Sequence, residues 1–222
     1  MHHKKLVLVA IIIITAVAIA VTSIVLGNVG LRKSSASPVA SEKPAVEPPI
    51  DEKGAEVTAS LPLFRRLSKD YTRGSQPAHG GIDALRRLGV KAVVDLRSIY
   101  DHTDDVGVAA ERAGLHYYWH PLSVWNPPTD EEAKNFISLV TDESKGPFYV
   151  FCSDGIHRTG EMSAIYRVAH DKWTVEQALK EMDEFGFNPY YYSLRNYVWT
   201  YARKFRPDAV PRTGRGLGPG ES

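Results

Sequence analysis

The stretch that decides the fold runs from Phe148 to Gly160 and reads FYVFCSDGIHRTG. Its first five residues are apolar or aromatic and end at the cysteine, which is typical of a buried β-strand. A short polar loop with Gly155 near its centre follows, and the sequence from Gly160 to His170 has a helical pattern. The order strand, tight loop, helix is typical of α/β proteins, in which parallel strands alternate with helices.

The same alternation extends on both sides of this stretch. A Thr-x-x-Glu capping box at Thr129 and Glu132 predicts where one helix begins. The last helical pattern is dense in aromatic residues, which we expect to pack on the sheet. The predicted strands lie at 92–96, 116–120 and 148–152, and the predicted helices at 81–88, 129–140, 160–170, 174–185 and 189–205. The sequence therefore predicts an α/β fold with a central, mainly parallel sheet flanked by helices.

The composition is uneven, and it divides the chain into four segments. Residues 1–33 contain an uncharged apolar run at 6–26, close to the ~20 residues that a helix needs to cross a bilayer. Residues 34–62 are rich in Pro, Ser, Ala, Glu and Lys, which predicts a linker without a core of its own. We expect one globular domain at 63–208, followed by a Gly-rich tail at 209–222.

The apolar run at 6–26 predicts attachment to a membrane. Small residues at Ala18 and Ala20 also match a signal-peptidase site, and cleavage there would make the protein secreted. We favour a retained transmembrane anchor, because apolar sequence continues from Val21 to Leu26, beyond that site. Both readings place the globular domain outside the cytoplasm if the protein is bacterial, in the periplasm or at the cell surface.

The overall composition excludes several classes of function. A net charge of +1 lacks the strongly basic character expected of a nucleic-acid-binding protein. The single cysteine, Cys152, excludes an intramolecular disulfide and a multi-cysteine zinc or iron–sulfur site. The histidines are scattered without the spacing of metal ligands, so neither a metal site nor another cofactor is predicted. The acidic residues Asp101, Asp104 and Asp105 are interpreted as a solvated turn.

The loop that follows Cys152 has the chemistry of an oxyanion site. Backbone N–H groups in a tight loop before a helix can converge on a tetrahedral anion, and Gly155 permits the turn. The positive end of the helix and Arg158 favour the thiolate of Cys152, and the Arg158 guanidinium can bind two phosphate oxygens at once. Thr159 can donate a hydrogen bond towards the sulfur. The predicted phosphate-binding residues are Ser153, Asp154, Gly155, Ile156, His157, Arg158 and Thr159.

The pattern Cys-x-x-Gly-x-x-Arg-Thr-Gly at 152–160 resembles the signature loop of the cysteine-dependent protein tyrosine and dual-specificity phosphatases. Three other segments are similar to the compact atypical dual-specificity phosphatases of bacteria, fungi and plants. These segments are YTRGSQP at 71–77, LGVKAVVDLR at 88–97 and HPL at 120–122. With the signature loop, they cover most of the chain between residues 64 and 170.

This resemblance implies hydrolysis of a phosphate monoester through a cysteinyl-phosphate intermediate, without a cofactor. It makes Cys152 the nucleophile and Arg158 the clamp for the phosphate, with the backbone of 153–158 as the cradle. The implied substrate is a phosphorylated protein or a small phosphoester. Arg73 and Arg97 also match motif positions, and Arg97 fits either a structural ion pair or a substrate contact.

The general acid of such a phosphatase usually lies on a mobile loop after the second predicted strand, but residues 122–128 contain no carboxylate. Three other side chains could protonate the leaving oxygen: Asp154, His157 and Asp130. We rank Asp154 first, because Cys-Ser-Asp-Gly also resembles the loop of the myotubularin lipid phosphatases, and this resemblance implies an acid within the loop. The place of Asp130 in the first turn of a capped helix explains it without catalysis.

Two other functions are compatible with the same loop. A catalytically weak phosphatase-like module would bind phosphorylated ligands and would not need the missing acid, and sulfurtransferases also place a cysteine in an anion loop. Gly155 followed by Arg158 and Thr159 favours phosphate chemistry. Because 153–156 carry no basic side chain, a polyphosphorylated inositol is disfavoured as substrate. Trp125 or the C-terminal tyrosines could line a cleft that binds phosphotyrosine.

Overall fold

The structure is a computed structural model that describes residues 58–211. The sequence predictions for the segment 1–33, for most of the linker 34–62 and for most of the tail 209–222 fall outside the described residues. Between residues 58 and 211, no helix combines the length and the apolar composition that crossing a bilayer requires.

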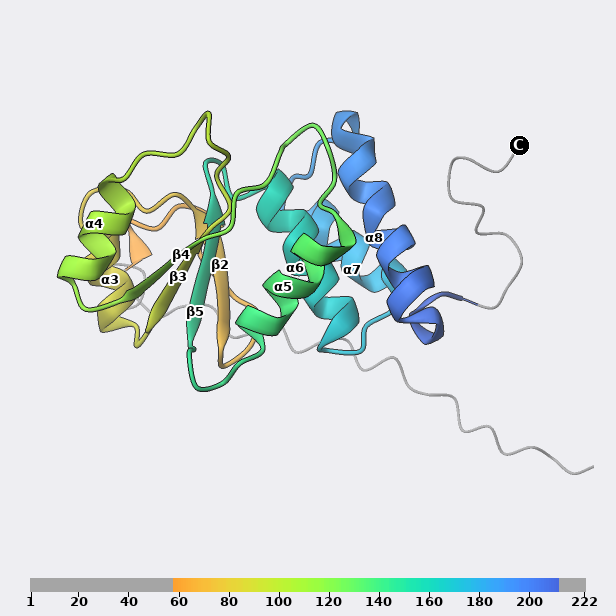
Figure 1. Cartoon of the computed structure of the whole chain (residues 1–222), viewed down its shortest axis with the longest axis horizontal. Helices are drawn as coiled ribbons and strands as arrows, with labels where there is room; N and C mark the ends of the chain where they lie inside the picture. The colour runs from red at the N-terminus through yellow and green to blue at the C-terminus, as the bar shows by residue number, and fades with distance from the viewer. Residues whose placement is uncertain (1–57, 212–222) are drawn as a thin grey trace, which may run out of the picture. The chain divides into compact units, whose positions relative to one another are not determined.

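A five-stranded sheet forms the centre of the molecule (Figure 1). The strands are β1 (Arg65–Arg66), β2 (Tyr71–Ser75), β3 (Ala92–Asp95), β4 (His116–Trp119) and β5 (Phe148–Cys152). Their order is β1-β2-β5-β3-β4, and all neighbours are parallel except β1 and β2. The predicted mainly parallel sheet is confirmed, as are three of its strands. The sequence did not reveal β2, because Arg73 and Gly74 interrupt its apolar pattern although all five of its residues are buried.

Helices cover both faces of the sheet (Figure 1). On one face lie α3 (Gly81–Arg87) and α4 (Asp105–Arg112), and on the other α5 (Asp130–Val140), α6 (His157–Ala169), α7 (Val175–Glu184) and α8 (Tyr192–Phe205). Short 3-10 helices, η1 and η2, occupy Pro189–Tyr191 and Pro207–Ala209. The prediction that the last helix packs on the sheet is wrong, because α6 lies between them and α8 packs on α6 and α7.

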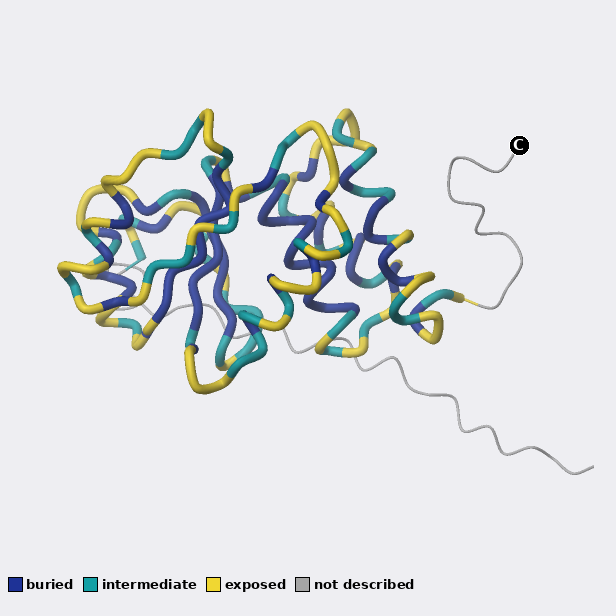
Figure 2. The backbone as a smooth tube through the Cα atoms, in the orientation of Figure 1, coloured by how far each residue is buried: buried dark blue, intermediate teal, exposed yellow. Residues whose placement is uncertain are grey.

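Strand β5 contributes to both halves of the core, which explains why it has no polar face. Phe148 and Val150 belong to the apolar cluster under α5 to α8, whereas Tyr149 and Phe151 belong to the cluster under α3 and α4. Successive side chains of a strand point to opposite faces, so a strand covered on both faces is apolar throughout. Figure 2 shows the same burial along the central strands and along α6.

Local signals fix where the helices begin. The capping box is confirmed, since the Thr129 hydroxyl accepts from the Glu132 N–H at 3.2 Å and the Glu132 carboxylate accepts from the Thr129 N–H at 2.6 Å. Helix α6 begins at His157, three residues before the predicted start at Gly160. Arg158 and Thr159 therefore lie in the first turn of a helix rather than in a loop.

Glu161, in α6, is a fully buried carboxyl group whose two oxygens have no hydrogen-bond partner among the described residues. Burial raises the pKa of Glu161 well above its ordinary value of 4.5. The unfolded chain therefore loses this proton at a lower pH than the folded protein. The contribution of Glu161 to the free energy of unfolding therefore falls as the pH rises above about 4.5, until the folded protein also loses the proton.

Replacing Glu161 with methionine should raise the free energy of unfolding at pH 7 by about 1–3 kcal/mol, because it removes two unpaired buried oxygens and the ionisable group. This gain in the free energy of unfolding should shrink as the pH falls towards 4.5. Urea unfolding at pH 7 and at pH 4.5 measures it. Glu161→Gln is the matched control, since it removes the pH dependence but keeps polar atoms in the core. A gain that is equal at both pH values would show that ionisation of Glu161 has no part in stability.

Candidate active site

The anion loop connects the carboxyl end of β5 to the first turn of α6. Cys152 ends the strand, is only 2% exposed, and is separated from the helix by residues 153–156. Gly155 has a φ of +69°, and a Cβ atom there would lie 2.5 Å from backbone atoms of Gly74 on β2. Only glycine fits both the conformation and the space, so the loop is fixed against β2.

Arg158 lies beside the loop and points back towards the sheet. Its side chain is almost buried, and its Nη1 and Nη2 atoms donate to the two oxygens of Asp101 at 3.1 and 2.7 Å. Burial opposes the charge, but Asp101 and Cys152 outweigh it and raise the pKa of Arg158. The Nε atom is buried and has no hydrogen-bond partner among the described residues. One donor of the guanidinium therefore remains unused.

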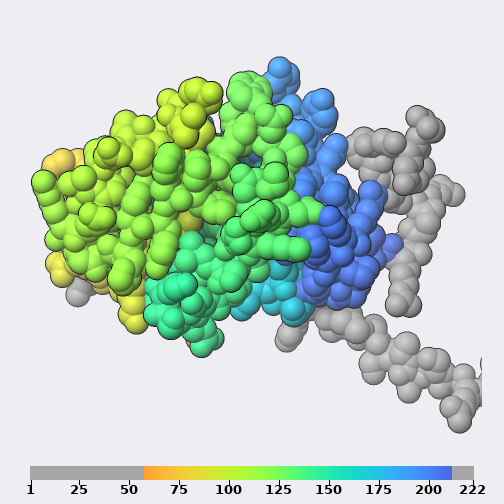
Figure 3. Space-filling view, viewed as in Figure 1, coloured from red at the N-terminus to blue at the C-terminus, as the bar shows by residue number. Residues whose placement is uncertain are grey.

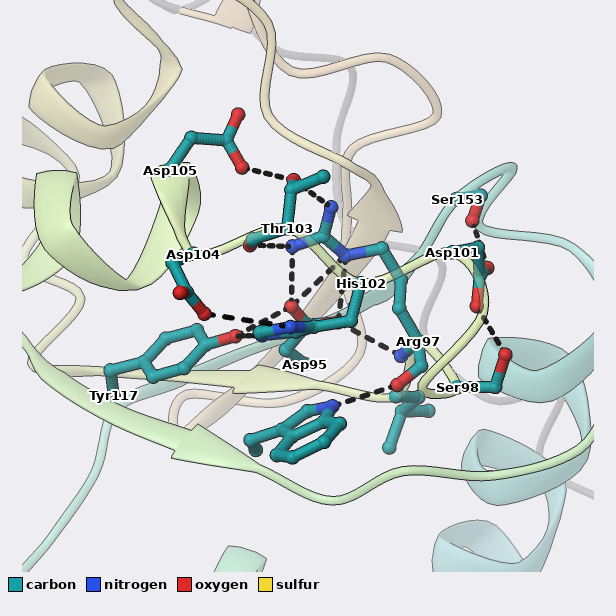
Figure 4. Close-up of polar contacts among 12 residues, drawn as sticks. Asp95, Arg97, Ser98, Asp101, His102, Thr103, Asp104, Asp105, Tyr117 and Ser153 are labelled. Atoms are coloured by element: carbon teal, nitrogen blue, oxygen red, sulfur yellow. Dashed lines mark hydrogen bonds and ion pairs between the residues drawn. The ribbon is translucent and has the colours of Figure 1, made fainter.

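Asp101 belongs to this site, and its interpretation as part of a solvated turn is wrong. Its carboxylate accepts hydrogen bonds from the Ser153 hydroxyl at 2.6 Å and the Ser98 hydroxyl at 2.5 Å (Figure 4). It accepts further hydrogen bonds from Arg158. Burial opposes ionisation, but these hydrogen bonds hold the pKa of Asp101 well below its ordinary value. The sequence did not indicate this role, because the contact depends on the strand order. Strands β3 and β5 are neighbours in the sheet, which brings the loop after β3 to the loop after β5.

Arg97 has a structural role in the same region. It is 1% exposed and donates from Nη2 to Asp95 Oδ2 at 2.6 Å, while the Tyr117 hydroxyl donates to the same oxygen at 2.7 Å (Figure 4). Its Nη1 and Nη2 atoms also donate to the side chain and the carbonyl of Thr103. These contacts fix both ends of the loop that carries Asp101, so Arg97 is a structural ion-pair partner.

The three candidates for the general acid lie in different surroundings. Asp154 is exposed within the anion loop. The His157 ring lies 4.2 Å from that of Tyr191, and burial lowers the pKa of His157. Asp130 pairs with Lys204 and accepts from the Tyr197 hydroxyl at 2.9 Å, and these two contacts lower the pKa of Asp130.

An aromatic wall of Trp125, Tyr190 and Tyr191 stands next to His157. The Trp125 ring is 5.4 Å from Tyr191 and 6.3 Å from Tyr190, and the Ser193 hydroxyl donates to the Trp125 carbonyl. Trp125 and Tyr190 are largely exposed. The loop after β4 thus meets the beginning of α8, as the green and blue protrusions at the top of Figure 3 show. The yellow-green segment near residue 100 forms a separate protrusion beside them.

Comparison with known proteins gives a consistent result. Residues 63–191 match the sequence pattern of a family described as DSP-PTPase phosphatase fused to NAD+ kinase. The chain is 32% identical over 138 residues to the dual specificity protein phosphatase TpbA of Pseudomonas aeruginosa, covering 59% of this chain and 57% of TpbA. It is 30% identical over 105 residues to a probable chloroplastic NAD kinase 2 of Oryza sativa subsp. japonica, covering 45% of this chain and 11% of the kinase.

Solved structures agree with these sequence matches. A crystal structure of P. aeruginosa TpbA is similar with a TM-score of 0.56 and 26% identity, covering 64% of this chain and 86% of that one. A variant of TpbA has also been solved in complex with phosphotyrosine, with a TM-score of 0.54 and 26% identity, covering 61% of this chain and 82% of that one. The chain spans little more than half the length of TpbA and about a tenth of the rice kinase.

Proposed function

Since this chain belongs to the family of DSP-PTPase phosphatases, matched over residues 63–191, we propose that it hydrolyses phosphate monoesters through a cysteinyl-phosphate intermediate. The observation that carries the proposal is the position of Cys152 at the end of β5, followed by the anion loop that leads to Arg158 in the first turn of α6. The Cys152 thiolate attacks phosphorus in line, and the phosphorus–oxygen bond to the leaving group breaks. Water then attacks the phosphocysteine, which releases inorganic phosphate and restores the thiolate.

Arg158 stabilises the charge on the phosphoryl oxygens in this scheme. Its pair with Asp101 uses one face of the guanidinium, formed by Nη1 and Nη2. The adjacent face holds the unpaired Nε and the second hydrogen of Nη2, which donates to the Ser153 hydroxyl at 3.3 Å. Two phosphoryl oxygens bound there would use Nε and would replace this Ser153 contact. Asp101 thus holds the guanidinium in one orientation without competing for the donors that the phosphate needs.

Asp154 is the general acid that we propose, because it is the exposed carboxyl group inside the anion loop. Both oxygens of Asp101 are occupied by hydrogen bonds from Arg158, Ser153 and Ser98, so this carboxylate is not free to face the leaving oxygen. Asp130 forms an ion pair with Lys204 on α8, and burial lowers the pKa of His157, which disfavours the protonated form that an acid needs. Asp154 would protonate the leaving oxygen and then accept a proton from the attacking water.

The substrate class that we propose is an aryl phosphate such as phosphotyrosine. The wall of Trp125, Tyr190 and Tyr191 offers exposed aromatic surface beside His157, against which a phenyl ring can stack. Two carboxylates, Asp101 and Asp154, adjoin the anion loop, so a ligand with several phosphates would meet repulsion. The complex of TpbA with phosphotyrosine supports the same class of substrate.

The experiment compares an activated ester, 4-nitrophenyl phosphate, with phosphotyrosine for the wild type and Asp154→Asn. We expect the wild type to hydrolyse both. In Asp154→Asn, the first step on 4-nitrophenyl phosphate, measured as the pre-steady-state release of 4-nitrophenol, should keep nearly the wild-type rate, because this leaving group needs little protonation. The first step on phosphotyrosine should slow by about 10²-fold or more.

Asp130→Asn is the matched control and should leave both rates unchanged. A wild type that hydrolyses neither ester would contradict the proposed function, and phosphate binding without turnover would then identify a binding module. Equal losses on both esters in Asp154→Asn would contradict the assignment of the acid. The membrane anchor at 6–26 and the location outside the cytoplasm stay predictions from the sequence.

A further inference from the structure

Three successive carbonyl groups of the anion loop accept hydrogen bonds from β2 and the residue after it. The pairs are Gln76 N–H to the Ser153 carbonyl at 3.2 Å, the Ser75 hydroxyl to the Asp154 carbonyl at 2.8 Å, and Arg73 Nη2 to the Gly155 carbonyl at 2.7 Å. The parallel register places Ser75 opposite Cys152. The carboxyl end of β2 and the residue after it therefore hold three consecutive peptide groups of the loop.

These contacts determine where the N–H groups of the loop point. In a planar trans peptide the carbonyl of one residue and the N–H of the next point in opposite directions. When β2 holds the carbonyls of 153–155, the N–H groups of 154–156 are turned away from β2. They face the concave side of the loop, where a phosphate would bind. Arg73 controls the last of these three peptide groups, the one that ends in the Ile156 N–H.

Arg73 is an unusual residue to find under such a loop. It is 1% exposed, and its Nε and Nη1 atoms have no hydrogen-bond partner among the described residues. Its guanidinium stacks on the Phe185 ring at 4.0 Å, and no carboxylate between residues 58 and 211 forms an ion pair with it. A Cβ atom added at Gly160 would lie 3.9 Å from Nη2, so the charge sits under the first turn of α6.

Stability alone does not explain this arrangement, because a buried cation without an ion-pair partner costs free energy. Glu181 and the Cys152 thiolate act on the Arg73 charge from a longer distance, and a phosphate in the loop would add a further anion. The buried charge of Arg73 and its hydrogen bond to the Gly155 carbonyl both favour a loop conformation in which the N–H groups converge on an anion.

We propose that Arg73 is a positioning residue of the phosphate cradle, which holds the Gly155 carbonyl outward and places a buried positive charge beneath the bound phosphate. This inference rests on the proposed function, in which the loop binds a phosphoryl group. Ser75 supports the neighbouring peptide in the same way through its hydroxyl.

The test measures the dissociation constant of tungstate, a tetrahedral oxyanion, by calorimetry on the full chain, together with the unfolding temperature. Arg73→Met should weaken tungstate binding by about 100-fold, because a cradle donor is misdirected and a cation is lost. Its unfolding temperature should stay equal or rise, since an unpaired buried charge has been removed. Arg73→Lys keeps the charge without the planar fork and should weaken binding by about 10-fold.

Thr72→Val is the matched control, because the Thr72 hydroxyl makes a buried hydrogen bond from the same strand to the Phe148 carbonyl and does not touch the loop. It should leave tungstate binding unchanged. A lower unfolding temperature with unchanged tungstate binding in Arg73→Met would overturn the inference in favour of a purely structural role. If that variant does not fold, wild-type binding in both Arg73→Lys and Ser75→Ala would overturn it.

A second readout is the ratio of Cys152 alkylation rates by iodoacetate and iodoacetamide. The cradle should bind the carboxylate of iodoacetate and accelerate its reaction, so the ratio should fall in Arg73→Met and stay unchanged in Thr72→Val. Neither readout requires turnover. A wild type that binds tungstate but hydrolyses no ester would contradict the proposed function alone, whereas a wild type that does not bind tungstate would overturn this inference.

Discussion

Replacing Cys152 with serine should lower the turnover of 4-nitrophenyl phosphate by at least about 10⁴-fold. A serine hydroxyl is not ionised near neutral pH and is a much weaker nucleophile than a thiolate. The thiolate of the wild type attacks directly, and its phosphocysteine bond is then broken by water. Initial rates at saturating substrate measure the loss.

Two observations separate loss of the nucleophile from loss of the fold. Cys152→Ser should still bind tungstate, because the loop N–H groups and Arg158 remain in place. Acid quenching of the wild type during turnover, followed by mass spectrometry, should locate phosphate on the peptide that contains Cys152. Turnover by Cys152→Ser within tenfold of the wild type, or phosphate on another residue, would contradict the mechanism.

Replacing Arg158 with lysine should lower kcat/KM for phosphotyrosine by about 10²- to 10³-fold. Lysine keeps the positive charge, but its ammonium group is a single point and cannot bind Asp101 and two phosphoryl oxygens at once. Arg158 can bind Asp101 and the phosphate with two faces of one guanidinium, since Nη1 and Nη2 bind Asp101 while Nε has no partner among the described residues. Most of the loss should appear in kcat, because charge on the phosphoryl oxygens is redistributed in the transition state.

Arg195→Lys is the matched control for this substitution. Arg195 forms an ion pair with Asp183 on the surface, where the same change should leave kcat/KM unchanged. An activity of Arg158→Lys within threefold of the wild type would show that Arg158 serves only to hold Asp101.

The sequence by itself determined the elements that depend on neighbouring residues. The apolar run ending at Cys152 predicted β5, and Thr129 with Glu132 predicted the start of α5, because strand burial and helix capping involve residues close along the chain. The spacing from Cys152 to Arg158 likewise placed both on one strand-loop-helix unit. These features follow from local geometry, so a single sequence is enough to find them.

Only the tertiary structure decided which distant residues complete the site. Asp101 meets Arg158 across 57 residues, and Arg73 meets the Gly155 carbonyl across 82 residues. No periodic pattern encodes these pairs, and an acidic turn or an arginine in a strand is usually solvated. They arise because the sheet order β2-β5-β3 brings the carboxyl ends of three parallel strands to one edge. Side chains that share this edge contact one another whatever their separation in sequence.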